Sequence, residues 1–175
     1  MADENDGLTE QIAWDGRALT VTWLAPPFRP EPRSTTQVLG LCFTPAGQIL
    51  LVTGDHEAWT LPGGHPEPGE TFEATLEREL REEGCARLVA CEYLGCQRVE
   101  DPQRPEGPDR YYQVRYWARI ELYPFAPRFE TVARQLVSPA TFLTTLAWGE
   151  AVAARHILDA GLGLEQRYDV LTTRE

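Results

Sequence analysis

The sequence predicts an α/β protein with a single domain, in which a mixed β-sheet is sandwiched between helices (an α/β/α sandwich). Its 175 residues suit one hydrophobic core. Stretches in which polar and apolar residues alternate, as in half-buried strands, occur on both sides of a central helical segment rich in glutamate. A further helical pattern near the C-terminus supplies the second helical layer.

The first part of the chain contains three predicted strands. Alternation over residues 19–23 indicates the first of them. A proline-rich crossing segment follows at residues 26–32, where missing N–H groups exclude the interior of a sheet. Residues 38–44 and 48–52 form the next two strands, around a turn at residues 45–47.

A helix is expected over residues 71–83. Phe72, Leu76 and Leu80 recur at helical spacing and form the stripe that faces the core. The glutamates of this segment lie off the stripe, so the helix can be packed and catalytic at once. Gly84 follows, and glycine commonly ends helices.

Further strands are expected after this helix. Residues 88–99 form the first of them, and residues 101–109 are a loop by composition. Residues 111–120 form a strand with Tyr112 on one face and Arg115 on the other. An edge strand is expected within residues 129–137.

Two helices complete the predicted fold. Ser138 followed by Pro139 matches an N-cap with a first-turn proline and opens a short helix. The final helix is expected over residues 149–160, closed by Gly161.

The single domain is placed at residues 17–164, with flexible tails expected at residues 1–16 and 165–175. No apolar run is long enough to span a bilayer, and the acidic start lacks the apolar region of a secretion signal. A cytoplasmic protein is therefore expected. A homodimer stays open, through a paired or swapped N-terminal strand.

The charge balance excludes several classes of function. The formal net charge of -11 argues against nucleic acid or an anionic membrane as a partner. All 16 basic residues are arginine, so chemistry that requires lysine, such as Schiff-base formation or a Walker-type phosphate loop, is excluded. The cysteines lack zinc-site spacing and are expected to be free thiols: Cys42, Cys85, Cys91 and Cys96.

Three glutamates on the central helix predict a metal site. Glu79, Glu82 and Glu83 are spaced so that they share one helix face, where like charges repel. Hard divalent cations such as Mg²⁺ or Mn²⁺ prefer oxygen ligands of this type. A solvated helix face with interspersed arginines is the commoner meaning of such a run. The glycine pair in the preceding loop favours the metal site and a small phosphate-bearing substrate.

One segment resembles the Nudix box, the signature of the Nudix (MutT-like) hydrolase family. It runs through Leu61-Pro62-Gly63-Gly64, Glu70 and Arg78-Glu79-Leu80-Arg81-Glu82-Glu83. The family pattern is glycine, five residues, glutamate, seven residues, Arg-Glu, an aliphatic residue, any residue and Glu-Glu, and the chain fits it throughout. One later position departs, because Cys85 stands where the pattern has glycine and Gly84 lies one place early. We expect a local shift in the turn that ends the helix.

The resemblance implies a Nudix-like fold and a pyrophosphohydrolase that cleaves a diphosphate linkage in a nucleoside-diphosphate-type substrate. In the family, helix carboxylates hold Mg²⁺ or Mn²⁺ ions that bridge the diphosphate. The implied metal ligands are Glu79, Glu82, Glu83 and the carbonyl oxygen of Gly63. Arg78 is expected to pair with Glu70 or Glu82 and to orient the carboxylates, since its planar fork suits that role.

The general base is expected to be a glutamate. Family members use either a box glutamate or one from a distant loop. Glu82 ranks first here, and the other candidates are Glu100, Glu106 and Glu130.

Four residues outside the box are candidates for substrate binding: Trp59, Arg98, Tyr112 and Arg115. The rings could stack on a nucleobase and the guanidinium groups could contact phosphates, whereas core packing and surface charge are the commoner roles for such residues. His65 is expected to bond to the backbone rather than to substrate.

Other functions are weighed against hydrolysis. A Nudix-fold nucleotide-binding or regulatory module without turnover is the main alternative, and the intact glutamates argue against it. The isopentenyl diphosphate isomerase branch of the fold needs a reactive cysteine in a loop setting that is missing here. An mRNA-decapping role lacks the basic track it would require. Dinucleoside polyphosphates, nucleotide sugars, ADP-ribose and oxidised nucleoside triphosphates all stay open as substrates.

Overall fold

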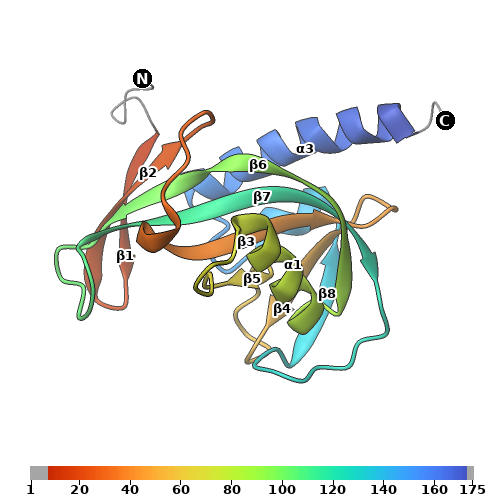
Figure 1. The fold of residues 1–175 in the computed structure, drawn as a ribbon, viewed down its shortest axis with the longest axis horizontal. Helices are drawn as coiled ribbons and strands as arrows, with labels where there is room; N and C mark the ends of the chain where they lie inside the picture. The colour runs from red at the N-terminus through yellow and green to blue at the C-terminus, as the bar shows by residue number, and fades with distance from the viewer. Residues whose placement is uncertain (1–7, 173–175) are drawn as a thin grey trace.

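The computed structural model describes residues 8–172 and shows an eight-stranded mixed sheet at the centre of the molecule (Figure 1). The strand order is β1-β2-β6-β7-β3-β4-β8, with β5 paired to β3. β3 and β7 run parallel, whereas the other paired strands are antiparallel.

The elements follow the predicted order closely. The strands are β1 (Thr9–Trp14), β2 (Arg17–Leu24), β3 (Thr35–Phe43), β4 (Ile49–Thr53), β5 (Gly63–Gly64), β6 (Ala86–Glu100), β7 (Arg110–Leu122) and β8 (Ala133–Val137). The helices are α1 (Phe72–Glu82), α2 (Pro139–Thr145) and α3 (Val152–Thr172), with a 3-10 turn, η1 (Pro32–Ser34). β8 begins later than the predicted edge strand but does lie at the edge of the sheet.

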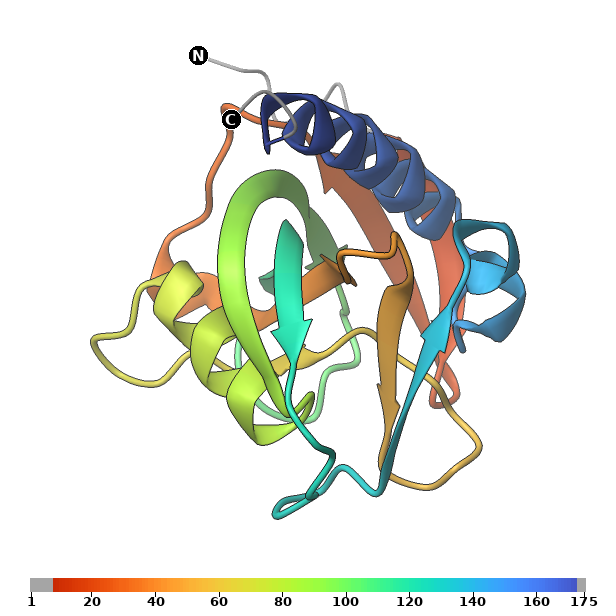
Figure 2. The ribbon, with the colours of Figure 1, turned by 90° about the vertical axis from the view of Figure 1, so that its right-hand side faces the viewer.

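Helices cover both faces of the sheet (Figure 2). α1 packs through Phe72, Leu76 and Leu80 into one buried cluster, as its spacing predicts. On the other face Ile157 of α3 belongs to a second cluster with Leu41. Since successive strand residues face opposite sides, each central strand contributes to both clusters. The predicted α/β/α sandwich is confirmed.

Side-chain hydroxyls cap the starts of α1 and α2, and the predicted N-cap at Ser138 is confirmed. The hydroxyl of Thr71 accepts from the N–H of Ala74 at the start of α1. The hydroxyl of Ser138 accepts from the N–H of Thr141 at the start of α2. The four cysteines are free. None of the helices within residues 8–172 is long and apolar enough to cross a membrane.

The expected N-terminal tail contains a strand in its described part. β1 pairs with β2 along its whole length, and Ile12 packs against the small cluster around Leu19. The carboxylate of Glu10 also accepts from the N–H groups of Val152 (3.1 Å) and Ala153 (3.4 Å), at the start of α3. A carboxylate is stabilising at a helix N-terminus. These contacts order residues 9–14, where a flexible tail was expected.

Gly161 does not end the last helix, contrary to the sequence-based expectation. It lies inside α3, where a Cβ would overlap Cδ2 of Leu41 and lie 3.7 Å from Cε2 of Phe43. The glycine therefore lets α3 approach β3 closely, and it is retained for packing rather than for termination.

The expected C-terminal tail is also largely helical, up to Thr172. The carboxylate of Glu165 accepts from Nη2 of Arg119 at 2.5 Å and from Nε1 of Trp117 at 3.0 Å. Asp169 accepts from the same arginine at 2.6 Å. These bonds fix the last turns of α3 to β7, and long-range pairing of this kind leaves no local pattern in the sequence. The domain boundaries themselves stay a prediction.

Close packing at Gly161 can be tested against a matched glycine in the same helix. Gly161→Ala should lower the free energy of unfolding by about 1–3 kcal/mol, because the methyl group meets Leu41. At Gly163 nothing lies within 4 Å of an added Cβ, so alanine meets no obstacle there. Gly163→Ala should raise the free energy of unfolding by about 0.5–1 kcal/mol. Urea denaturation followed by circular dichroism measures both, and shifts of the same sign would contradict the packing account.

Candidate active site

The glycine pair of the box lies directly against the helix carboxylates. On β3, Leu39 pairs with Gly63 and Val38 with Gly64. A Cβ at Gly64 would overlap Oε1 of Glu79, and one at Gly63, whose φ is +142°, would overlap the carbonyl oxygen of Val38. Gly63 therefore requires glycine, whereas a side chain at Gly64 would displace the carboxylate of Glu79. The backbone of β5 therefore comes closer to α1 than any side chain would allow.

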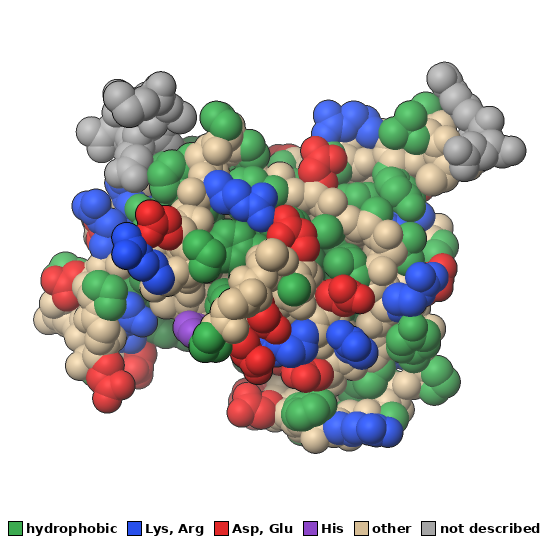
Figure 3. Space-filling model, in the orientation of Figure 1, with side chains coloured by type: hydrophobic (Ala, Val, Ile, Leu, Met, Phe, Trp, Pro, Cys, Tyr) green, Lys and Arg blue, Asp and Glu red, His purple; other side chains and the backbone are tan. Residues whose placement is uncertain are grey.

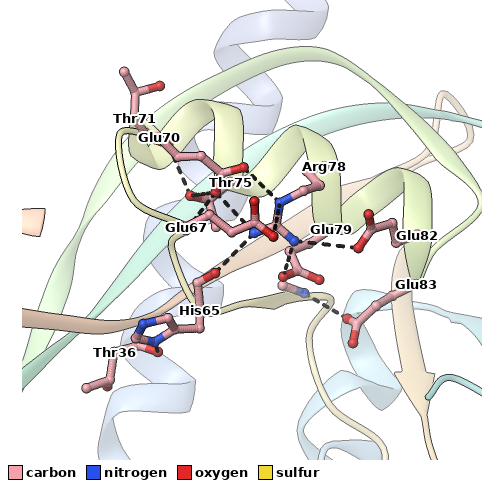
Figure 4. Close-up of polar contacts among 11 residues, drawn as sticks. Thr36, His65, Glu67, Glu70, Thr71, Thr75, Arg78, Glu79, Glu82 and Glu83 are labelled. Carbon is pink, nitrogen blue, oxygen red and sulfur yellow. Dashed lines mark hydrogen bonds and ion pairs between the residues drawn. The ribbon is translucent and has the colours of Figure 1, made fainter. Parts of the chain in front are cut away.

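Arg78 joins the helix to the loop that precedes it (Figure 4). Its Nε and Nη2 donate to the two carboxylate oxygens of Glu70, at 2.8 and 3.0 Å. Nη1 donates to Oε1 of Glu79 at 2.7 Å, and Nη2 also donates to the carbonyl oxygen of His65 at 3.1 Å. Oε2 of Glu82 lies 3.5 Å from Nη1. The predicted pairing with Glu70 is confirmed, and the same guanidinium also holds two of the predicted metal ligands.

Glu70 is a fixed negative charge. The hydrogen bonds from Arg78 lower its pKa to about 2, and the N–H of Glu67 acts in the same direction. The hydroxyl of Thr75 also donates to Oε2, at 2.9 Å. With both oxygens bonded, Glu70 anchors Arg78 rather than taking up protons near neutral pH.

Glu83 has the opposite character. It caps the C-terminal end of α1, and its Oε2 accepts from the N–H of Gly63 at 3.1 Å. Burial, together with the negative charges of Glu79, Glu130 and Glu82, raises the pKa of Glu83 to about 7, against the lowering effect of the Gly63 bond. Glu83 is therefore a buried carboxylate with other carboxylates near it.

The donor set fits a divalent cation in chemistry, although the carboxylates are not gathered around one point. Within residues 8–172 no three His, Cys, Asp or Glu side chains are placed so that they could hold one metal ion. Figure 3 shows acidic side chains gathered together with arginines over α1 and the adjoining loop. Carboxylate and carbonyl oxygens suit Mg²⁺ or Mn²⁺, and such an ion would offset the mutual repulsion of these carboxylates. The ligand set stays a prediction.

The turn after α1 differs from the expected local shift. Cys85 itself takes the left-handed conformation, with a φ of +46°, at the position where the box has glycine. Gly84 is packed instead, since a Cβ there would lie 3.0 Å from Cδ2 of Leu50. The carbonyl oxygen of Cys85 accepts from the N–H of Tyr123 at 2.8 Å. Position 85 therefore has a backbone conformation that favours glycine, although the residue there is cysteine.

The candidates for substrate binding fall on two different faces of the sheet. Arg98 pairs in register with Tyr112, so both face the α1 side. Tyr112 is buried there, with its ring 5.7 Å from that of Phe28. The structure therefore does not bring Arg98 and Tyr112 together with the other two candidates.

Trp59 and Arg115 lie on the α3 side and are linked through a residue that the sequence reasoning missed. The guanidinium carbon of Arg115 lies 5.6 Å from the ring centre of Trp148. The carbonyl oxygen of Trp59 accepts from the N–H of Ala147, the residue before Trp148, at 2.8 Å. Trp148 lies in the connection between α2 and α3, where no periodic pattern could have marked it. Substrate-binding roles stay predictions for all four candidates.

The remaining candidate residues are placed as follows. His65 bonds to the backbone, as expected. Its Nδ1 lies 3.0 Å from the carbonyl oxygen of Thr36 and donates to it, since a carbonyl oxygen can only accept. Glu100 pairs with Arg110 at 2.9 Å, and Glu106 lies in the loop that joins β6 to β7. Glu130, in the loop before β8, is close enough to act on the pKa of Glu83. Among the loop candidates for the base, Glu130 is thus tied to the box.

Comparison with known families and structures agrees with this geometry. The family model for the NUDIX domain matches residues 33–159. The pyrophosphohydrolase BsRppH of Bacillus subtilis is similar in fold, with 23% identity, a TM-score of 0.64 and coverage of 86% of this chain and 94% of that chain. The MutT protein of Bacillus halodurans gives 20% identity and a TM-score of 0.53, over 70% of this chain and 82% of that chain. A NUDIX hydrolase of Nitrosomonas europaea gives 16% identity and a TM-score of 0.55, over 72% and 87%.

The left-handed conformation of Cys85 predicts an ordering of two variants. Cys85→Gly and Cys85→Ala both remove the sulfur atom, but only alanine keeps a Cβ in the unfavourable conformation. The glycine variant should therefore be the more stable by about 1 kcal/mol. Thermal and urea denaturation measure the difference, and an alanine variant of equal or greater stability would contradict the assignment.

The low pKa of Glu70 predicts a pH-dependent contribution to stability. Because the pKa falls from 4.5 to about 2 on folding, the stabilisation is fully present above pH 4.5 and is lost as the pH approaches 2. Glu70→Gln should lower the free energy of unfolding at pH 7, and its difference from the parent protein should shrink over that acidic range. Urea denaturation at a series of pH values tests this, with Glu77→Gln on the exposed face of α1 as the control. A difference that persists unchanged in acid would rule out the linkage.

Proposed function

The chain belongs to the Nudix family, and on that premise we propose that it is a metal-dependent hydrolase that cleaves a diphosphate linkage in a nucleoside-diphosphate-type substrate. The observation that carries the proposal is the set of three carboxylates at the end of α1, Glu79, Glu82 and Glu83, two of which contact or adjoin the glycine pair of β5. Arg78 neutralises only part of this charge, because much of its bonding goes to Glu70. A dianionic linkage would approach such a cluster only if a cation stood between them.

The cation would be held by Glu79, Glu82, Glu83 and the carbonyl oxygen of Gly63. Mg²⁺ or Mn²⁺ bound there would neutralise phosphate charge and lower the pKa of a water molecule. Glu82, whose side chain is 35% exposed, has room to turn from Arg78 towards Glu83. Gly63 and Gly64 let the backbone of β5 approach the carboxylates closely.

The other box residues act through position. Arg78 holds Glu79 in place through Nη1, and Glu70 in turn fixes the orientation of Arg78 through two bonds. Glu82 is the first choice for the group that takes the proton from the attacking water. Glu130 is the second choice, since its charge reaches Glu83 from outside the helix. Each can accept a proton at a carboxylate oxygen when it lies within hydrogen-bond reach of that water.

A nucleotide-binding module without turnover is the alternative function. The complete set of carboxylates supports hydrolysis instead, since a module that merely binds would not require a general base. The ligand is a small phosphate compound in either case. We also propose that it is contacted by one or more of the candidate residues Arg98, Arg115, Tyr112 and Trp59.

Hydrolysis is tested with a panel of nucleotides, nucleotide sugars and dinucleoside polyphosphates, with products identified by mass. Activity should require Mg²⁺ or Mn²⁺ and disappear with a chelator. The variants Glu82→Gln and Glu130→Gln are compared to identify the general base. The variant that removes the base should have a kcat lower by about 10²–10⁴-fold. Glu83→Gln should weaken Mn²⁺ binding measured by electron paramagnetic resonance. Glu77→Gln, on the exposed face of the same helix, is the matched control.

The outcomes separate the two functions. Tight nucleotide binding without any product, with either metal, would favour the module. Turnover that survives the chelator, or that is unchanged in both Glu82→Gln and Glu83→Gln, would contradict the assigned site.

A further inference from the structure

A buried arginine on the α3 side of the sheet has no carboxylate partner. Arg115, on β7, is 3% exposed. Its Nη1 donates to the carbonyl oxygen of Val114 and its Nη2 to Oε1 of Gln113, both at 3.1 Å. Its Nε has no hydrogen-bond partner within the described chain. The ring of Trp148 covers the guanidinium from one side.

A second arginine on the same strand and face shows the contrast. Arg119 is bonded to the carboxylates of Glu165 and Asp169. Arg115 has only neutral oxygens around it, and burial lowers its pKa to about 9. A buried charge without a counter-charge destabilises a fold. The charge of Arg119 is balanced by two carboxylates of α3, whereas the charge of Arg115 has no such partner in the described chain.

Two more buried polar atoms beside Arg115 lack partners in residues 8–172. They are Oε1 of Gln97 on β6 and Nε1 of Trp23 on β2. Gln97 pairs in register with both Gln113 and Trp23, so these side chains share the face of Arg115. With Nε of Arg119, which also lacks a partner, the described part of the α3 side presents three unused donors and one unused acceptor on three neighbouring strands.

This polar group lies near the proposed diphosphate site. Gly63 pairs with Leu39, and Leu39 pairs with Arg115, so the three residues form one row across β5, β3 and β7. Two strand spacings separate the ends of the row, which is about 10 Å. Trp148 also donates from Nε1 to the hydroxyl of Thr60 at 3.5 Å, shortly before the glycine pair. A separation of this size is comparable with the length of one nucleotide.

The chemistry of the unused atoms selects the kind of ligand. An anion would meet the oxygens of Gln97, Gln113 and Val114 as well as the guanidinium, which disfavours a phosphate. A heterocycle with adjacent acceptors and a neighbouring N–H satisfies both types of group. Arginine bonds in this way to O6 and N7 of guanine, whereas adenine offers an amino group at the place of O6.

We propose that Arg115 and Gln97 form a base-recognition site for 6-oxopurine nucleotides, in which the guanidinium donates to O6 and N7 and the Gln97 oxygen accepts from N1–H. Trp148 stacks against the arginine and keeps its fork in plane. The inference deepens the proposed function, because it names the base of the nucleotide whose diphosphate would reach the box.

The test uses nucleoside monophosphates, which have no diphosphate linkage, so that base recognition is measured apart from hydrolysis. Calorimetry should show GMP and IMP binding about tenfold or more tightly than AMP or UMP. Arg115→Met should abolish this preference while leaving AMP binding within about twofold. Arg115→Lys keeps the charge but loses the planar fork, and it should lose the preference as well.

Stability measurements guard against a merely structural role for Arg115. Replacing an unpaired buried charge by an apolar group is often neutral or stabilising, so Arg115→Met should melt at the same temperature as the parent or higher. Arg119→Met, whose arginine is paired with the carboxylates of Glu165 and Asp169, should keep the ratio of GMP to AMP affinity.

Several results would overturn the proposal. They are equal affinity for GMP and AMP in the parent protein, equal loss for both in Arg115→Met, and full retention of GMP binding in Arg115→Lys. Competition by ribose 5-phosphate as strong as by GMP would show an anion site instead. Absence of diphosphate hydrolysis with the base preference intact would instead count against the proposed function alone.

Discussion

The geometry of the site depends on the guanidinium of Arg78. Its planar fork holds Glu70 with two bonds and still reaches Glu79 and the carbonyl oxygen of His65. An ammonium group is a point charge and does not present donors in this fixed arrangement. The loop, the helix and β5 are therefore held together by one side chain. The glycine pair can lie against Glu79 because α1 is fixed at that distance.

The sheet keeps two kinds of surface in register. Successive residues of β7 point to opposite sides, so Val114 packs beneath α1 while Arg115 faces α3. β3 does the same with Val38 and Leu39, which are the two residues paired with the glycines. A slip of one residue would exchange the faces of every side chain in the strand. The position of the box relative to the far face is thus fixed by backbone hydrogen bonds.

Much of the box could be predicted because its determinants are local. The glycine pair, the spacing of the glutamates and the apolar stripe all lie within one short stretch of the chain. Other features depend on partners distant in sequence. Gly161 has the pattern of a stop signal until the contact with Leu41 is known. The last turns of α3 depend on the ion pair between Glu165 and Arg119. The alternation of residues along β7 predicts which face of the sheet Arg115 lies on, but it cannot predict that Arg115 lacks a carboxylate partner.

The parallel pairing of β3 with β7 has a consequence for how the protein folds. It joins Thr35 to Tyr112, and the whole box, from the glycine pair to the end of α1, lies in the stretch of chain enclosed between them. Closing a long stretch loses chain entropy before any contact rewards it, so such pairings form late and slowly. During synthesis, the segment that carries the chemistry leaves the ribosome well before the strand that completes its sheet. The sheet that supports the carboxylate cluster is therefore completed only after the residues of the cluster have been synthesised.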